Sequence, residues 1–138
     1  MKVLVIDGQG GGVGKALVSQ LRKTLPEQEV LALGTNALAT AAMLKAGATA
    51  GATGEHAIIW QCRDAGLILG AAGILIAGAM MGEVSPGISL AIAQSPAVKV
   101  LIPSERCGVL IAGTVKLTLD EAVADCLQKA AEIIRARA

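Results

Sequence analysis

The first fifteen residues constrain the fold more than any other part of the chain. An apolar run over residues 3–6 leads into Asp7 and then into five glycines within the seven positions from Gly8 to Gly14. Leu17, Leu21 and Leu25 follow at four-residue intervals before Pro26, a pattern typical of a helix with one buried face. A strand, a glycine-rich turn and a helix in this order predict the βα unit that begins a parallel sheet.

The glycines also predict a class of ligand. Glycine lacks a Cβ atom, so a ligand can approach its backbone closely, and the first N–H groups of a helix attract an anion such as a pyrophosphate. The spacing G-x-x-x-G-x-G fits Gly8, Gly12 and Gly14, whereas G-x-G-x-x-G fails at Val13. A P-loop would need a glycine at Gln9 and a hydroxyl at Ala16. The loop therefore favours a Rossmann-type site, and the alternative is a turn that only packs helix against strand.

The rest of the chain alternates between strand and helix patterns. Strands are predicted at residues 2–6, 30–33, 48–50, 67–69 and 98–102, with helices between them, one of them capped by Thr53. A capping box begins the last helix at Thr118. This pattern predicts a single α/β domain over residues 1–138, a three-layer Rossmann-like doubly wound parallel sheet of order 3-2-1-4-5. The apolar run over residues 109–112 could add a sixth strand at the edge.

Ligands of such sheets bind beyond the carboxyl ends of the strands, where the strand order reverses. The predicted binding residues surround that point: Asp7, Gly8, Gln9, Gly10, Gly11, Gly12, Val13, Gly14, Gly34, Thr35, Asn36, Gly70 and Ala71. At the end of the second strand, a carboxylate would bind the ribose hydroxyls of NAD, and an arginine would bind the phosphate of NADP. The neutral Thr35 and Asn36 suit NAD, NADP or a mononucleotide, or they only cap the next helix.

Asp7 stands where the first strand meets the glycine loop. Its carboxylate can accept backbone N–H groups that fix the turn, or it can orient a ribose or a metal-bound phosphate. A bare carboxylate beside a pyrophosphate would repel it. We therefore expect Asp7 either to keep its distance from the ligand or to have a cation between them.

The remaining candidates for chemistry are Glu83, Glu55, His56 and Cys107. Glu83 ends an uncharged run and could serve as a general base. Cys107 follows Arg106, whose charge could lower the pKa of the thiol, although a buried inert thiol is the alternative. His56 lies in the first turn of a predicted helix, where the dipole disfavours its protonated form, so we expect a surface or cap residue. No catalytic residue is assigned.

Composition excludes several classes of partner. A net charge of +1, no basic cluster and 1% aromatic residues argue against nucleic acid. The three cysteines, Cys62, Cys107 and Cys126, lie too far apart in sequence for a zinc or dithiol motif, so we expect no metal and reduced thiols in the cytoplasm. Asp7 interrupts the N-terminal apolar run too early for a signal peptide. The uncharged residues 65–82 contain five glycines, which suit a strand, a turn and a helix better than a membrane span.

Two resemblances agree with these expectations. The first segment, with residues 67–74 (LILGAAGI), resembles the cofactor-binding half of short-chain dehydrogenases/reductases, although a chain without tyrosine lacks that family's catalytic acid. Ile6 to Gly12, Gly34 to Ala37 and Met81 to Glu83 are similar to segments of short bacterial Rossmann-like proteins of unknown function. The second resemblance covers nearly the whole chain and implies the fold and a ligand site, but no activity.

The sequence thus favours a small cytoplasmic Rossmann-type protein that binds NAD(P) or a related nucleotide as a sensor, carrier or accessory subunit. One alternative is a small enzyme acting on a nucleotide-linked or polar substrate through Glu83 or Cys107. Another is an oligomeric scaffold without a ligand. The apolar, glycine-rich helices after the fourth strand predict a homodimer or higher homo-oligomer.

Overall fold

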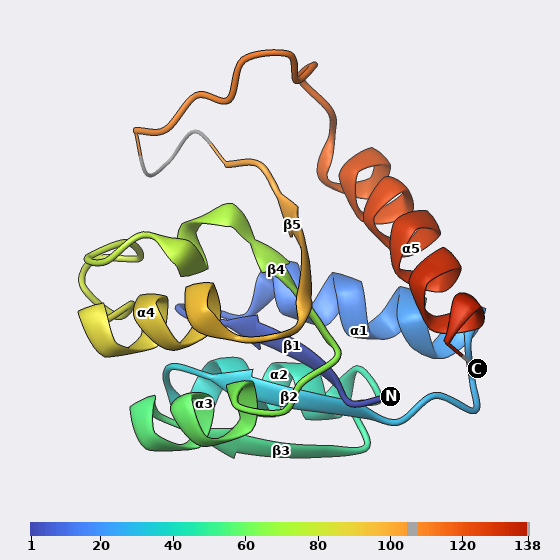
Figure 1. Cartoon of the computed structure of the whole chain (residues 1–138), viewed down its shortest axis with the longest axis horizontal. Helices are drawn as coiled ribbons and strands as arrows, with labels where there is room; N and C mark the ends of the chain where they lie inside the picture. The colour runs from blue at the N-terminus through green and yellow to red at the C-terminus, as the bar shows by residue number, and fades with distance from the viewer. Residues whose placement is uncertain (105–107, 138) are drawn as a thin grey trace.

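The computed structural model describes residues 1–104 and 108–137, and its centre is a five-stranded parallel sheet (Figure 1). The strands are β1 (Val3–Asp7), β2 (Val30–Gly34), β3 (Ala50–Thr53), β4 (Leu67–Ala71) and β5 (Val98–Ile102), in the order β3-β2-β1-β4-β5. This confirms the predicted α/β class and strand order. Asp7 pairs with Gly34 in register, so the carboxyl ends of β1 and β2 finish side by side.

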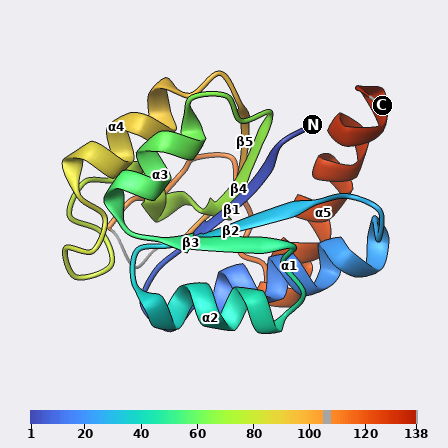
Figure 2. The ribbon, with the colours of Figure 1, turned by 90° about the horizontal axis from the view of Figure 1, so that it is seen from below.

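Helices cover both faces of the sheet (Figure 2). One face carries α1 (Gly12–Thr24), α2 (Ala37–Lys45) and α5 (Leu119–Ala136), and the other carries α3 (Glu55–Cys62), the 3-10 turn η1 (Ala72–Leu75) and α4 (Pro86–Gln94). The side chains of β1 alternate between the two resulting cores. Val3 and Val5 join the core beneath α1 and α5, while Leu4 and Ile6 join the core beneath α3 and α4. This two-sided burial explains why β1 is a continuous apolar run.

The sixth strand expected at residues 109–112 does not form. Val109, Leu110 and Ile111 are 42%, 77% and 48% exposed and lie outside the sheet. The chain after β5 travels away from the sheet before it returns as α5, as Figure 1 shows. Strand propensity needs a neighbouring strand to pair with, and the backbone here is carried out of reach of the β5 edge.

The third strand and the following helix begin later than the sequence predicts. β3 spans Ala50–Thr53, so Thr53 belongs to the strand, and its hydroxyl lies 2.7 Å from the Thr40 hydroxyl. The residue before α3 is Gly54, which makes no side-chain cap. The prediction that Thr53 caps this helix was therefore wrong, because tertiary contact with α2 holds the hydroxyl elsewhere.

The uncharged segment over residues 65–82 forms β4, η1 and turns, as expected. Within residues 1–104 and 108–137, no helix is both long and apolar enough to span a bilayer.

Candidate functional site

Asp7 lies beneath the glycine loop and holds its two ends. The carboxylate is buried, and it accepts the Gly8 N–H at 2.8 Å on Oδ1 and the Gly14 N–H at 2.6 Å on Oδ2. Burial raises the pKa of this carboxyl, the two N–H groups oppose that shift, and the nearby charge of Glu83 adds to it. The interpretation that Asp7 fixes the turn is confirmed. With both oxygens engaged below the loop, Asp7 does not present a bare carboxylate to the space above it.

Close packing explains three of the five loop glycines. A Cβ at Gly8 would lie 2.6 Å from Thr35 Oγ1 and 2.8 Å from Met80 Sδ. A Cβ at Gly14 would lie 2.6 Å from Met43 Sδ. Gly11 has φ +75°, and its Cβ would lie 2.9 Å from the backbone of α2. For these positions the fold itself requires glycine.

Gly10 and Gly12 differ from the other glycines of the loop. A Cβ at either position would meet nothing within 4 Å, and neither residue has positive φ. The N–H groups of Gly10, Gly12 and Val13 make no hydrogen bond to any part of the chain that the structure describes. Because the N-cap residue of α1 offers no side-chain cap, the N–H groups of Gly12 and Val13 at the start of this helix have no acceptor among the described residues, and neither does that of Gly10 just before it.

Glu83 contacts the loop at Gln9, away from the two loop residues that Asp7 holds. Its Oε1 accepts the Gln9 N–H at 2.9 Å, the Thr35 hydroxyl at 2.7 Å and the Asn36 Nδ2 amide at 2.7 Å. These three donors lower the pKa of the Glu83 carboxyl, the Gln9 N–H most strongly, so the group is ionised at neutral pH. The carboxylate therefore joins the carboxyl ends of β1 and β2 from a segment that follows η1.

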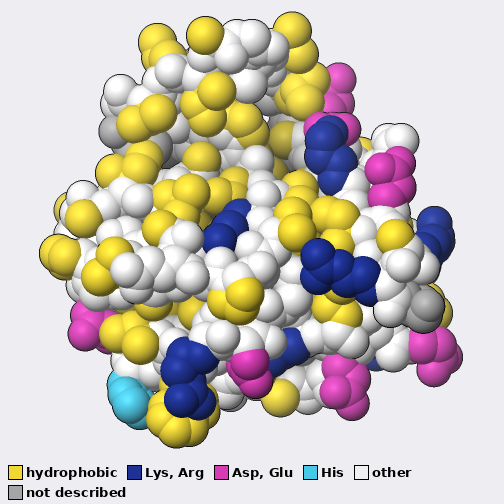
Figure 3. All heavy atoms as spheres, in the orientation of Figure 1, with side chains coloured by type: hydrophobic (Ala, Val, Ile, Leu, Met, Phe, Trp, Pro, Cys, Tyr) yellow, Lys and Arg dark blue, Asp and Glu magenta, His cyan; other side chains and the backbone are white. Residues whose placement is uncertain are grey.

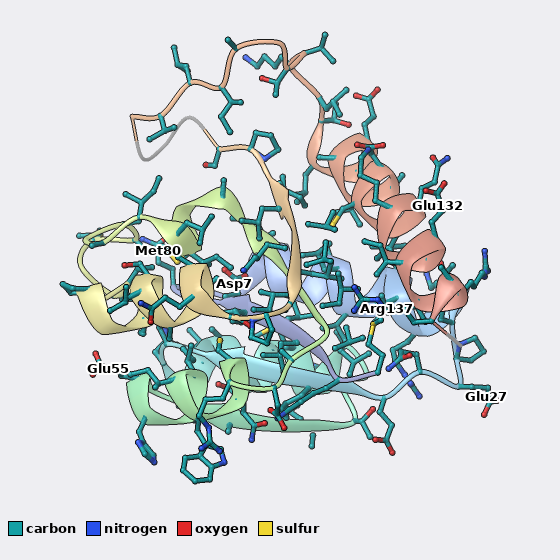
Figure 4. The ribbon with its side chains drawn as sticks, viewed as in Figure 1. Asp7, Glu27, Glu55, Met80, Glu132 and Arg137 are labelled. Atoms are coloured by element: carbon teal, nitrogen blue, oxygen red, sulfur yellow. The ribbon has the colours of Figure 1, made fainter. Side chains whose placement is uncertain are left out.

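The segment that carries Glu83 has an unusual backbone. Gly78, Met80, Met81 and Gly82 all have positive φ, with 57° at both methionines. Strained backbone of this kind persists only where surrounding contacts hold it. Met80 lies over Gly8 at the end of β1, on the same side of the molecule as Asp7 in Figure 4. Sequence reasoning missed the role of Met80, and the closely spaced Gly78 and Gly82 were the only local signal.

Asn36, which follows β2, caps the next helix and also contacts the glycine loop. Asn36 caps α2 by accepting the Ala39 N–H at 2.9 Å, and its amide nitrogen also donates to Gln9 O at 3.0 Å. The predicted cap is confirmed, and the same side chain contacts the loop. Gly34 is explained by packing, since its Cβ would lie 2.7 Å from Asn36 O.

The predicted residues on β4 are less accessible than those on the loop. Gly70 and Ala71 are both buried. A Cβ at Gly70 would lie 2.7 Å from Ile6 O, so the packing of β4 against β1 is sufficient to require this glycine.

A groove of about 1010 Å³ runs between α1 and α5 and begins at the glycine loop. Gly12 and Lys15 line it from α1, while Asp120, Gln128 and Arg135 line it from α5. The outer side of the loop thus opens onto a groove lined by charges of both signs.

The remaining candidates lie apart from the loop or outside the described residues. Glu55 accepts the Ser85 hydroxyl, and His56 is exposed with its ring 6.0 Å from that of Trp60. Cys107 and Arg106 lie outside the described residues.

The two described cysteines, Cys62 and Cys126, are free and buried. Burial raises the pKa of each thiol to about 11, which makes both poor nucleophiles. Across residues 1–104 and 108–137, no three His, Cys, Asp or Glu side chains are grouped so as to hold a metal ion.

These features define a Rossmann-like α/β domain with a glycine-rich loop between β1 and α1 whose helix start is open. The chain belongs to the family described as "Domain of unknown function (DUF3842)", whose model matches residues 2–135. No curated protein and no solved structure matches it. The expectation of a Rossmann-like family without an assigned activity is therefore confirmed, while the similarity to short-chain dehydrogenases/reductases remains a sequence resemblance.

Proposed function

We propose that this protein binds NAD(P) or a related nucleotide through the loop from Gly8 to Gly14, and that it serves as a sensor, carrier or accessory subunit. The ligand's phosphates would accept the free N–H groups of Gly10, Gly12 and Val13. The positive end of the α1 dipole adds to this attraction. Lys15, exposed in the first turn of the same helix, supplies a nearby positive charge.

The observation that carries the proposal is the open space at Gly10 and Gly12. Neither packing nor backbone conformation requires glycine at these two positions. A ligand lying against the backbone would require it, because a side chain there would occupy the ligand's space. A loop built only to pack α1 against the sheet needs Gly8, Gly11 and Gly14, and leaves the other two unexplained.

The alternatives carry less support. Glu83 holds three hydrogen bonds that lower its pKa, which makes it a weak general base and disfavours an enzyme that relies on it. A scaffold without a ligand accounts for the fold but does not explain why Gly10 and Gly12, which face open space, are glycines. The binding hypothesis accounts for both.

Gly12→Val tests the proposal, because its side chain would enter open space rather than the core. We expect the variant to fold and to lose nucleotide affinity by about tenfold or more, since the side chain would occupy the position of a phosphate oxygen. Calorimetric titration of the wild-type protein and the variant with NADH, NADPH and ATP measures the affinities. Thermal unfolding checks the fold.

Gly87→Ala is the matched control. Gly87 lies in α4, and its Cβ would make only ordinary contact with the Glu55 carboxylate, at 3.4 Å or more. This variant should bind as the wild type does. Equal affinity of wild type and Gly12→Val would place the site elsewhere, and no saturable binding by the wild type would reject nucleotide binding altogether.

A further inference from the structure

The carboxylate of Glu83 lies where a Rossmann-type site receives a ribose. In dinucleotide-binding sheets the sugar lies over the end of the second strand, where a carboxylate from that strand normally holds its hydroxyls. Here β2 ends in Gly34, and Thr35 and Asn36 follow it, so β2 supplies no acid. Both Thr35 and Asn36 instead donate to Glu83.

Only one of the two carboxylate oxygens of Glu83 is used. All three donors bind Oε1, and Oε2 has no hydrogen-bond partner among the residues that the structure describes. The residue as a whole is partly exposed. The protein thus holds an ionised carboxylate in a fixed position with one acceptor oxygen still available.

The loop thus places a group of anion-binding N–H donors next to a bound carboxylate. The amides of Gly10, Gly12 and Val13 favour an anion, while one residue away, at Gln9, the loop already binds a negative charge. A ligand that satisfies both parts carries phosphates at one end and neutral hydroxyl donors at the other. Hydroxyls donating to a carboxylate form strong, charge-assisted hydrogen bonds, whereas a phosphate in that position would be repelled.

We infer that Glu83 selects a ribose without a 2′-phosphate, so that the protein binds NAD in preference to NADP. This inference rests on the proposed nucleotide site. The acid that reads the sugar comes from the segment before α4 rather than from the end of β2. Met80 and Glu83 of this segment both lie against Gly8 at the end of β1.

Glu83→Gln separates this role from a purely structural one. The glutamine Oε1 can still accept from Gln9, Thr35 and Asn36, so the tie between the segment and the strand ends is kept while the charge is lost. A structural role predicts that the relative affinities for the two ligands stay unchanged. A sugar-reading role predicts that they change.

The experiment compares the affinities for NADH and NADPH of the wild-type protein and of Glu83→Gln, with ADP-ribose and its 2′-phosphate as probes without nicotinamide. We expect the wild type to bind NADH at least about tenfold more tightly than NADPH, and the variant to reduce this ratio to about threefold or less. Glu55→Gln is the control, because Glu55 contacts Ser85 rather than the loop. It should keep the wild-type ratio.

The outcomes separate the two proposals. Nucleotide binding without preference, or a preference that survives in Glu83→Gln, would overturn the role of Glu83 and leave nucleotide binding standing. A preference for NADPH in the wild type would overturn it as well. No saturable binding of any of the four probes would overturn both.

Discussion

Asp7 is a buried charge whose two oxygens perform the task that a capping side chain performs elsewhere. The N-cap position of α1 is Gly11, which has no side chain, and the Gly14 N–H in the first turn donates to Asp7 instead. The same carboxylate holds Gly8 at the other end of the loop. Asp7 therefore holds both ends of the loop, and we expect its replacement to affect the stability of the fold as well as the site.

We predict that Asp7→Asn destabilises the protein by about 1–3 kcal/mol at neutral pH. An amide has only one acceptor oxygen, so one buried N–H group loses its partner and faces the amide's NH₂. Urea unfolding measures the loss. Asp125→Asn on α5 serves as a control, because Asp125 is exposed and forms an ion pair with Lys129 one turn along the same helix; it should change stability by less than about 0.5 kcal/mol.

The pH dependence of this difference tests the raised pKa of Asp7. When the pKa of a carboxyl is higher in the folded state than in the unfolded state, folding favours its protonated form. The contribution of Asp7 to stability therefore increases as the pH falls from above its folded-state pKa to below its unfolded-state pKa of about 3.8. The stability gap between the wild type and Asp7→Asn should therefore widen on acidification. A gap that narrows would mean that the carboxylate's hydrogen bonds outweigh its burial.

The sequence predicted the loop but not what each glycine is for. In the sequence nothing distinguishes the five glycines from one another, and their spacing suggested that all of them serve ligand binding: Gly8, Gly10, Gly11, Gly12 and Gly14. The contacts divide them into three that pack and two that face open space, and those contacts come from Thr35, Ala39 and Met43, which the chain brings back later. The distinction depends on tertiary structure, so no local pattern could show it.

At the scale of elements, the helix starts divide into capped and open ones. Asn36, Ser85 and Thr118 cap α2, α4 and α5 through their side chains, whereas α1 and α3 begin after glycines with no such bond. α3 carries Glu55 in its first turn, where a negative charge interacts favourably with the positive end of the helix dipole, but α1 has no acidic residue in its own first turn. In α1 the only first-turn N–H group with a described side-chain acceptor is that of Gly14, which donates to Asp7 from the end of β1, and the N–H groups of Gly12 and Val13 have no partner among the described residues.

We predict that Thr118→Ala destabilises the protein by about 1 kcal/mol. In the capping box of α5, Thr118 Oγ1 accepts the Glu121 N–H at 3.2 Å, and Glu121 Oε1 accepts the Thr118 N–H at 3.0 Å. Alanine removes the first bond, and urea unfolding measures the effect. Thr118→Ser keeps the hydroxyl and should recover most of the loss; equal stability of all three proteins would show that the box contributes nothing.

Local signals predicted some elements well and others poorly. The capping box predicted the start of α5 correctly because its hydrogen bonds lie within the segment, and the run at residues 98–102 predicted β5 correctly because β4 is there to pair with it. The strand expected at 109–112 failed because its formation depends on an edge that lies elsewhere in space. Thr53 failed as a cap for a similar reason, since α2 holds its hydroxyl.

At the scale of the whole molecule, the strand order was predictable and the assembly of the site was not. Right-handed crossovers between parallel strands leave few arrangements, and the observed order is the expected one. The contact of Glu83 with Thr35, by contrast, joins residues 48 positions apart. No periodicity or spacing encodes that contact, although Glu83 was already a candidate as a charged residue beside an apolar run.

The structure also leaves a set of apolar side chains uncovered. The part of the segment between β5 and α5 that begins at Val109 carries exposed apolar residues, with Leu110 77% and Val115 76% exposed, and hydrophobic side chains gather over it at the top of Figure 3. Residues 108–115 contain no charge. The outer edge of β5 is unpaired within the described sheet, and Val98 on that strand is 37% exposed. An isolated chain therefore keeps an apolar surface in water.

We propose that this segment, more than the helices after β4, mediates a homodimer, because the strand-forming run at 109–112 suits the open β5 edge of a second copy. Residues after β4 also expose Leu75, Met81 and Leu90. Leu110→Glu should weaken self-association by about tenfold or more, since a charge would be buried against apolar atoms. Sedimentation equilibrium at micromolar concentration measures the dissociation constant of both proteins.

Leu38→Glu is the control for this test, because Leu38 is similarly exposed, at 68%, but lies on α2 on the opposite side of the sheet order from β5. It should associate as the wild type does. A wild type that sediments as a monomer would reject the dimer, and a dimer that persists in Leu110→Glu but is lost in Leu38→Glu would move the interface to the α2 side of the molecule. In either of those cases the apolar segment after β5 would need a different partner.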